Sequence, residues 1–114
     1  MGISLKGSFG TPPLTQWQIR AWALAQCSGS AHFDAENGFS SLVDNGAGSF
    51  TFHFSTNMSD SNYVITGSTG RNGQPHFSLT GNARAADQFT IATGTWGTGY
   101  SAVDCDSVML VVCK

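Results

Sequence analysis

The sequence predicts an all-β fold: an antiparallel β-sandwich or barrel-like domain of about eight short strands, with an irregular N-terminal arm. From residue 19 onward, short runs alternate apolar and polar residues, as expected for strands with one buried face. Gly and Asn recur between these runs at the spacing typical of turns. No window carries the period of an amphipathic helix, and residues 82–87 are long enough for one helical turn at most. A chain of 114 residues fits one such domain, residues 19–114.

Residues 1–18 precede the alternating pattern and form the predicted arm. Gly7, Gly10 and the Pro12-Pro13 pair interrupt any regular period, and a Pro-Pro pair continues neither a helix nor a central strand. This segment is therefore expected to be an irregular arm or linker.

Eight runs are expected to form strands: residues 19–27, 30–34, 39–43, 49–55, 62–68, 74–80, 88–93 and 107–113. The clearest is 49–55, in which one face carries Phe50, Phe52 and Phe54 and the other carries Ser49, Thr51, His53 and Ser55. Asp44-Asn45-Gly46 joins this run to the preceding one, and these residue types tolerate the positive φ of a tight hairpin.

The last run, around residues 108–112, is apolar on both faces. Such a strand lies either in the centre of a sheet or against another subunit. We favour the second alternative.

Composition and charge exclude several classes of partner. Charged residues make up 11% of the chain and the net charge is −2, which does not fit a protein that neutralises many phosphates, so no nucleic acid is expected. No apolar stretch is long enough to span a bilayer and the N-terminus lacks an export signal, so we expect synthesis in the cytosol without membrane insertion.

The three cysteines are Cys27, Cys105 and Cys113, and their spacing does not match a metal site. An odd number argues against a complete disulfide framework, so three buried thiols in a reducing cytosol are expected. A disulfide between Cys105 and Cys113 is the alternative.

The sequence carries none of the common catalytic motifs, and neither enzymatic activity nor a cofactor is expected. Asp104 and Asp106 are interpreted as loop and strand-start residues, since two carboxylates alone do not make a calcium site. The histidines, His32, His53 and His76, each fall on the strand face opposite a phenylalanine and are expected to face solvent or an interface. The alternative is a metal held by one histidine from each of three symmetry-related chains.

Trp96 and Tyr100 lie in a Gly- and Thr-rich segment, residues 94–100, that is expected to be a loop. Exposed aromatic rings beside hydroxyl groups can stack on sugars, which makes these residues candidate ligand-binding positions together with Arg71 and Asn72. Alternatively, the two rings cover a core edge or a neighbouring subunit.

Several segments together resemble a known family. They are Arg20-Ala21-Trp22, residues 27–30, residues 42–54, Asn57-Met58, residues 62–64 and residues 106–108. This set is similar to the C-terminal domain of tail-fibre and tail-associated virion proteins of tailed bacteriophages. The chain departs from that pattern at Ala23 and Ala25, where the family has larger residues, and at Ser59, where proline is common.

The resemblance implies a structural component of a tailed-phage virion, of the short-fibre, tail-tip or head-decoration type, that takes part in adhesion or particle assembly. It further implies a homotrimer, contacts with other virion proteins and a possible glycan of the host surface, and location in the virion after assembly in the host bacterial cytoplasm. Within the arm, Ile3, Leu5, Phe9 and Leu14 are the expected attachment residues. The alternative function is a free-standing lectin-like carbohydrate-binding module.

Overall fold

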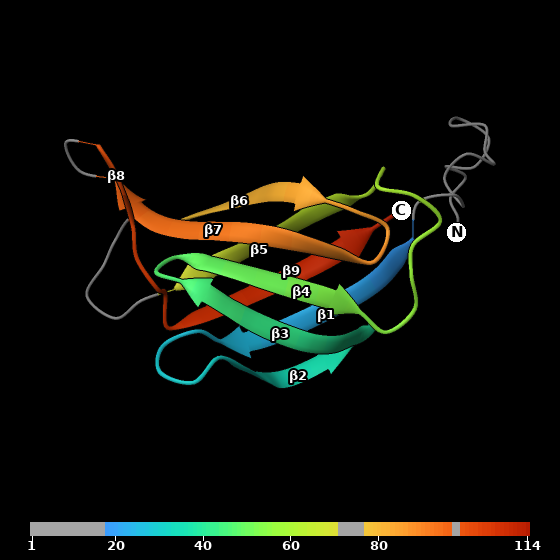
Figure 1. Cartoon of the computed structure of the whole chain (residues 1–114), viewed down its shortest axis with the longest axis horizontal. Coiled ribbons are helices and arrows are strands. Elements are labelled where there is room, and N and C mark those ends of the chain that lie inside the picture. The colour runs from blue at the N-terminus through green and yellow to red at the C-terminus, as the bar shows by residue number, and fades with distance from the viewer. Residues whose placement is uncertain (1–17, 71–76, 97–98) are drawn as a thin grey trace, which may run out of the picture.

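Nine strands and no helix make up the part of the chain that this computed structural model describes, residues 18–70, 77–96 and 99–114 (Figure 1). The strands are β1 (Ile19–Gln26), β2 (His32–Asn37), β3 (Phe39–Gly46), β4 (Ser49–Phe54), β5 (Val64–Gly70), β6 (Phe77–Arg84), β7 (Gln88–Trp96), β8 (Tyr100–Ala102) and β9 (Ser107–Cys113). The predicted all-β fold is therefore confirmed. None of the described segments is a helix long and apolar enough to cross a membrane.

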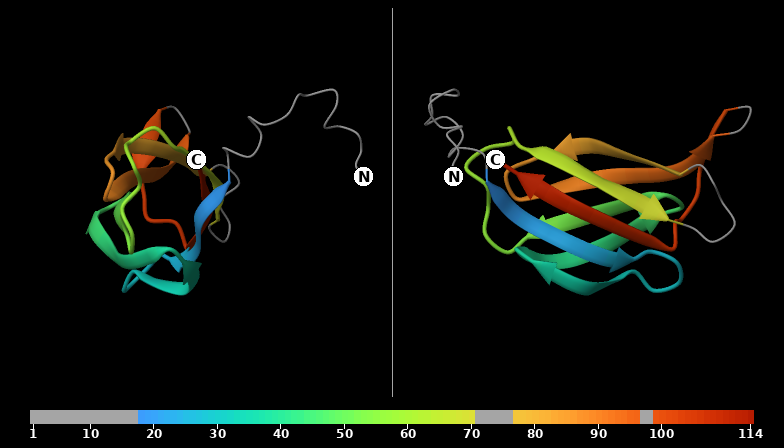
Figure 2. Two further views of the ribbon diagram at one scale, coloured as in Figure 1. Left: turned by 90° about the vertical axis from the view of Figure 1, so that its right-hand side faces the viewer. Right: turned by 180° about the vertical axis from the view of Figure 1, so that it is seen from behind.

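The strands form two antiparallel sheets that stack as a sandwich. Sheet A has the order β2-β1-β9-β5, and sheet B has the order β3-β4-β7-β6, with β8 paired to β7. Sheet B lies in front in Figure 1, and the view from behind in Figure 2 brings β1, β9 and β5 of sheet A to the front. Each sheet thus has one face toward the shared core and one face outward.

The core combines large side chains from one sheet with small ones from the other. Sheet B contributes a cluster of aromatic rings, in which Phe52 and Phe89 stack with ring centres 5.1 Å apart. Sheet A contributes a row of three buried alanines from β1, Ala21, Ala23 and Ala25. The alternation predicted for β4 is confirmed, because its three phenylalanines are buried and His53 lies on the outer face.

Strand β9 lies in the centre of sheet A, between β1 and β5. Val108, Leu110 and Val112 point into the core, whereas Met109 is 54% exposed on the outer face. The alternative that placed this strand in the centre of a sheet is therefore correct within the chain. The outer face of the strand is apolar as well.

The β3–β4 hairpin turns two residues later than predicted. Its turn is Ala47-Gly48, while Asn45 is an extra residue in β3, since Asp44 pairs with Phe50 and Gly46 pairs with Ser49. The Asp44 carboxylate accepts a hydrogen bond from the Gly46 N–H at 3.0 Å, which closes the bulge that sequence reasoning took for the turn itself.

Two segments expected to be irregular or helical are strands. Strand β7 continues through Trp96 and β8 pairs with it, because the Thr-rich run suits an extended ladder despite its glycines. Residues 82–84 end β6 instead of forming a helical turn. The Ala85 N–H then donates to the Gln88 carbonyl at 2.8 Å and closes the turn into β7.

The two ends of the described domain meet in sheet A. The Gln18 N–H donates to the Lys114 carbonyl and the Lys114 N–H donates to the Gln18 carbonyl, both at 2.9 Å. The β1–β9 ladder is thereby extended to the last residue of the chain.

Candidate functional site

The outer face of sheet A carries an apolar surface built from three neighbouring strands. We call it the sheet A patch and define it by Trp22 and Leu24 of β1, Met109 and Val111 of β9, and Val64 of β5. Trp22 is 41% exposed, Val64 49% and Met109 54%.

The register of the ladders brings the patch residues together. Trp22 pairs with Val111 and Leu24 pairs with Met109 across β1 and β9. Residues that face each other across a ladder share a side of the sheet and lie about 5 Å apart. The patch is hollowed by a depression of about 430 Å³, and none of the residues that line it is charged. Such a surface can bury apolar area against a partner but offers no group for catalysis.

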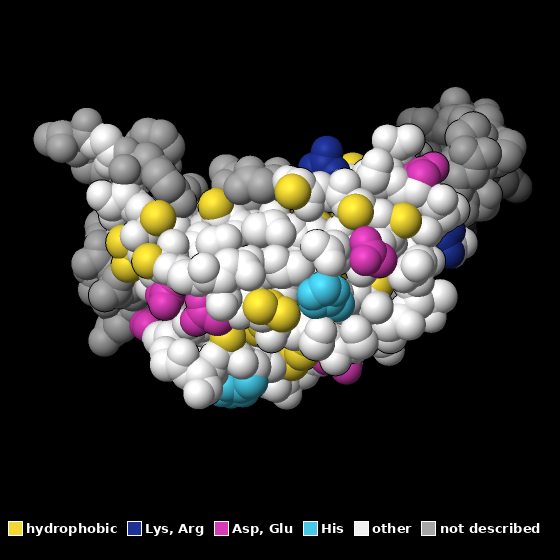
Figure 3. Space-filling model, in the orientation of Figure 1, with side chains coloured by type: hydrophobic (Ala, Val, Ile, Leu, Met, Phe, Trp, Pro, Cys, Tyr) yellow, Lys and Arg dark blue, Asp and Glu magenta, His cyan; other side chains and the backbone are white. Residues whose placement is uncertain are grey.

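The outer face of sheet B differs in character. Figure 3 views the molecule from the side of β3, β4 and β7 and shows mainly uncharged polar side chains and backbone, with scattered apolar and charged groups. On this face the Thr51 and Thr90 hydroxyls lie 2.9 Å apart, and the Asn45 amide donates to Thr51 at 2.7 Å. Val43 is the large apolar residue exposed there, at 42%. The concentrated apolar surface therefore belongs to sheet A.

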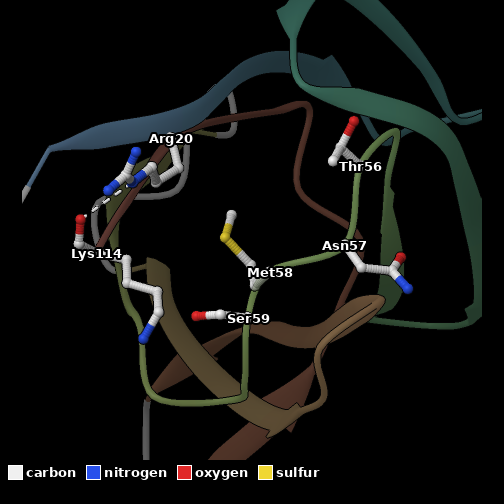
Figure 4. Close-up of a pocket in the computed structure, with 6 residues that line it drawn as sticks. All are labelled: Arg20, Thr56, Asn57, Met58, Ser59 and Lys114. Atoms are coloured by element: carbon white, nitrogen blue, oxygen red, sulfur yellow. Dashed lines mark hydrogen bonds between the residues drawn. The ribbon is translucent and has the colours of Figure 1, made fainter.

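A pocket of about 370 Å³ lies near the ends of the domain (Figure 4). It is lined by Arg20, Thr56, Asn57, Met58, Ser59 and Lys114. Figure 4 shows the Met58 side chain in the middle, with both cationic residues to one side.

Both cations of this pocket are engaged with neighbours. The Arg20 guanidinium donates to the Lys114 backbone carbonyl at 3.1 Å, and the Lys114 ammonium donates to the Asp60 carboxylate at 2.8 Å. The hydrogen bond from Lys114 holds the pKa of Asp60 below its usual range. Because a carboxylate already compensates the ammonium, the pocket is a poor anion site.

The structure places the predicted ligand-binding residues only in part. Trp96 and Tyr100 face each other across the β7–β8 ladder, so the backbone brings the two aromatic residues to one end of the sandwich. Arg71 and Asn72 lie outside the described residues, and so do the four predicted attachment residues of the arm, Ile3, Leu5, Phe9 and Leu14.

The described histidines occupy surface positions. His32 is exposed and lies 2.8 Å from the Ser30 carbonyl and 3.2 Å from the Asp34 carboxylate, while His53 is half-buried on the outer face of sheet B. His76 falls outside the described residues. Within the described ranges, no group of three or more His, Cys, Asp or Glu side chains could hold a metal ion. Asp104 accepts a hydrogen bond from the Gly48 N–H at 2.7 Å, which fits its predicted role in a loop.

The expectation of three buried free thiols is confirmed except that Cys113 is only half-buried. All three thiols are free, with Cys27 and Cys105 fully buried and Cys113 half-buried. Cys105 precedes β9 and Cys113 ends it, and an extended strand of this length separates them by roughly 20 Å. The alternative disulfide between these two is therefore wrong, and the cysteine that lies next to Cys105 is Cys27. A signal for this contact was present, because Cys27 continues the inward alternation of Ala21, Ala23 and Ala25.

Comparisons with models of protein families, with curated proteins and with solved structures found no match to this chain.

Proposed function

We propose that this chain is a structural component of a tailed-phage virion, of the short-fibre, tail-tip or head-decoration type, and that it assembles as a homotrimer. In this proposal the sheet A patch lies between subunits, and residues 1–18 attach the trimer to another virion protein. The resemblance of residues 19–114 to phage fibre domains supplies the class of protein. The sheet A patch is the observation that carries the assembly.

The patch supports self-association because its exposed apolar residues lie on neighbouring strands and none of them is charged. Single exposed apolar residues are normal on protein surfaces, but contiguous ones mark sites of interaction. Here Trp22, Met109 and Val64 are each about half exposed on three adjacent strands. Since Phe50, Phe52 and Phe54 are buried in the chain's own core, any contact made by sheet B would use its outer, more polar face.

Light scattering on the purified chain tests the assembly. The wild type is expected at three times the chain mass, and Met109→Lys is expected to be a monomer, because a charge in the contact is left without a partner. Val43→Lys is the matched control, since Val43 is similarly exposed but belongs to sheet B. A monomeric wild type at micromolar concentration contradicts the trimer, and dissociation by both variants contradicts the placement of the contact.

The role of the arm has a separate test. Deleting residues 1–17, which keeps the Gln18–Lys114 pair of sheet A, is expected to leave the trimer intact and to abolish its incorporation into phage particles. Normal incorporation of the truncated chain would remove the arm from the mechanism.

A lectin-like carbohydrate-binding module is the second candidate, favoured by the pairing of Trp96 with Tyr100 at one end of the sandwich. Sugar rings stack on aromatic faces, and the ladder brings these two aromatic residue types to paired positions. Under this alternative the purified chain binds a defined glycan as a monomer, and Trp96→Ala abolishes the binding. Co-purification with particles and no glycan binding would favour the virion role instead.

A further inference from the structure

The two buried cysteines meet at the junction where β1 ends and β9 begins. Gln26 pairs with Ser107, and the Cys27 N–H donates to the Asp106 carbonyl at 3.0 Å, so the ladder continues one step beyond both strands. The chain bends at Asp106, and Cys105 turns into the core, where it is as fully buried as Cys27. The two side chains interact with each other in the core.

A third buried group fixes the position of Cys105. The Thr93 hydroxyl of β7 hydrogen-bonds the Cys105 side chain and donates to the Val103 carbonyl at 2.7 Å. Cys105 is therefore held at the junction of sheet A and sheet B, next to Cys27. A sulfur–sulfur bond requires two cysteines at closely neighbouring backbone positions, and this junction provides them.

The chemistry of the pair distinguishes its two members. The hydrogen bond to Cys105, together with burial, raises the pKa of Cys27, so Cys27 stays a thiol at neutral pH and can donate its proton. The same hydrogen bond lowers the pKa of Cys105. Cys105 is thus the nucleophilic member, because the thiolate is the reactive form.

A surface hollow lies beside the segments that flank the pair. This hollow of about 360 Å³ is lined by Ser28 and Gly29, which follow Cys27, and by Asp104 and Asp106, which flank Cys105. Both cysteines are fully buried, and the segments that flank them border this hollow. A peroxide is expected to reach the pair from the hollow when one of these segments is displaced.

We propose that Cys27 and Cys105 are a site of disulfide formation, and that a peroxide converts the pair into a covalent link between the end of β1 and the start of β9. The Cys105 sulfur attacks one peroxide oxygen, the O–O bond breaks, and Cys105 becomes a sulfenic acid with release of one water. The Cys27 sulfur then attacks the Cys105 sulfur and displaces the hydroxyl, which leaves as a second water with the Cys27 proton. Two thiols lose two electrons in total, and hydrogen peroxide is reduced to two waters.

The link would join positions that are distant in sequence. It closes a loop that contains β2 to β8, and long loops give the largest reduction in the entropy of the unfolded chain. Oxidation is therefore expected to raise the melting temperature by about 10 °C or more. This inference does not depend on the virion role, since it concerns the folded chain in any setting.

Thiol counting on the purified full-length chain provides the test. The reduced protein is treated with hydrogen peroxide, unfolded, and labelled with a maleimide. We expect three labels before oxidation and one afterwards, with a loss of 2 Da in the unlabelled oxidised protein, for two hydrogens. Dithiothreitol is expected to restore three labels and the lower melting temperature.

The Cys113→Ser variant identifies the linked residues. In this variant trypsin yields one peptide, residues 21–71, that carries Cys27 and one, residues 85–114, that carries Cys105, so a joined pair of these peptides is unambiguous. Cys27→Ala is expected to abolish the link. The wild-type measurement alone decides the question if that variant does not fold. Three labels after oxidation, or a link that disappears in Cys113→Ser, would overturn the proposal.

Discussion

At the scale of single residues, Gly48 ties the β3–β4 hairpin to the rest of the sandwich. Its carbonyl accepts from the Thr93 N–H at 2.8 Å and its N–H donates to the Asp104 carboxylate at 2.7 Å. Its φ is +70°, in the left-handed region, and a Cβ at this position would collide with the Thr93 carbonyl oxygen and the Val103 nitrogen. Only glycine satisfies both conditions.

Gly48→Ala is therefore expected to cost roughly 3 kcal/mol of unfolding free energy, through left-handed strain and the collision together. Gly29→Ala is the control, because Gly29 has nearly the same φ, +73°, with nothing near its Cβ position. The control should cost only about 1 kcal/mol. Urea denaturation of both variants measures the difference, and equal costs would show that the close contact at Gly48 relaxes freely.

Gly46→Val provides a second test of the same hairpin. Gly46 has a φ of +131° and open space around it, so the cost comes from the backbone alone. We expect a loss of about 1 kcal/mol or more, because a β-branched residue avoids positive φ. An unchanged melting temperature would show that the bulge adopts another conformation in solution.

Tyr63 closes the long connection between β4 and β5. Its ring is buried edge-on against Phe54, with ring centres 5.5 Å apart, and its hydroxyl donates to the carbonyls of Ala85 at 2.8 Å and Gln88 at 3.0 Å. Burial raises the pKa of Tyr63 to about 12.

Tyr63→Phe is expected to lower stability by about 1 kcal/mol at neutral pH, since the two carbonyls lose their donor. The ordinary tyrosine pKa is about 10 and the folded value is higher, so the folded state retains the proton more strongly. The contribution of this group is therefore complete below pH 10 and lost as the pH rises through 12. Urea denaturation at pH 8 and pH 11 should show a smaller pH effect in Tyr63→Phe than in the wild type.

At the scale of elements, the alanine row of β1 adapts sheet A to the aromatic rings of sheet B. Ala21, Ala23 and Ala25 are buried in the same core as Phe52 and Phe89. Two aligned sheets are typically about 10 Å apart, and large rings on one sheet leave room only for small side chains on the other. This explains why β1 carries alanine at its three inward positions.

Ala25→Leu is expected to cost about 1 to 3 kcal/mol, because the added carbons overpack a fully buried site. Ala35→Leu serves as control, since Ala35 lies exposed on the neighbouring strand β2 and should tolerate the change within about 0.5 kcal/mol. Thermal unfolding of both variants gives the comparison. Equal stability of the two would mean that the core has room beside Ala25.

The alternation of β4 was predictable from the sequence because its three phenylalanines are spaced by two residues and all face the core. The ends of β6 and β7 could not be predicted from the sequence. Asn82 and Gly94 are residue types that favour turns, yet both are paired along the backbone with neighbouring strands. The sheet A patch was half predictable. The apolar outer side of β9 was visible in the sequence, but its neighbours Trp22 and Val64 are defined by strand order. The inward direction of Cys27 was also visible in the sequence, but its contact with Cys105 depends on a tertiary bend at Asp106.

At the scale of the whole molecule, one cluster of aromatic rings connects sheet A with sheet B. Phe39 lies within 6 Å of the ring centres of Phe33, Phe52, Phe54 and Phe89, so β2 of sheet A and three strands of sheet B share it. We therefore expect the two sheets to unfold together.

Phe52→Ala tests this coupling. Its ring is fully buried, and truncation is expected to cost about 3 to 5 kcal/mol, a large part of the stability of a domain of this size. Near-ultraviolet and far-ultraviolet circular dichroism should shift together to a lower denaturant midpoint in the variant. Separate transitions for the two signals would indicate that the sheets are independent units.

The pairing of β1 with β9 determines when this domain can fold during its synthesis. Strand β9 is the common neighbour of β1 and β5, and Gln18 is bonded to Lys114 at the end of the ladder. Sheet A is therefore incomplete until β9 has emerged from the ribosome, and β1 stays without this neighbour while β2 to β8 are translated. Contacts so distant in sequence make folding slow and leave unpaired strand edges exposed in the meantime. Until the seven-residue strand Ser107–Cys113 has emerged, these exposed edges can associate with those of other nascent chains.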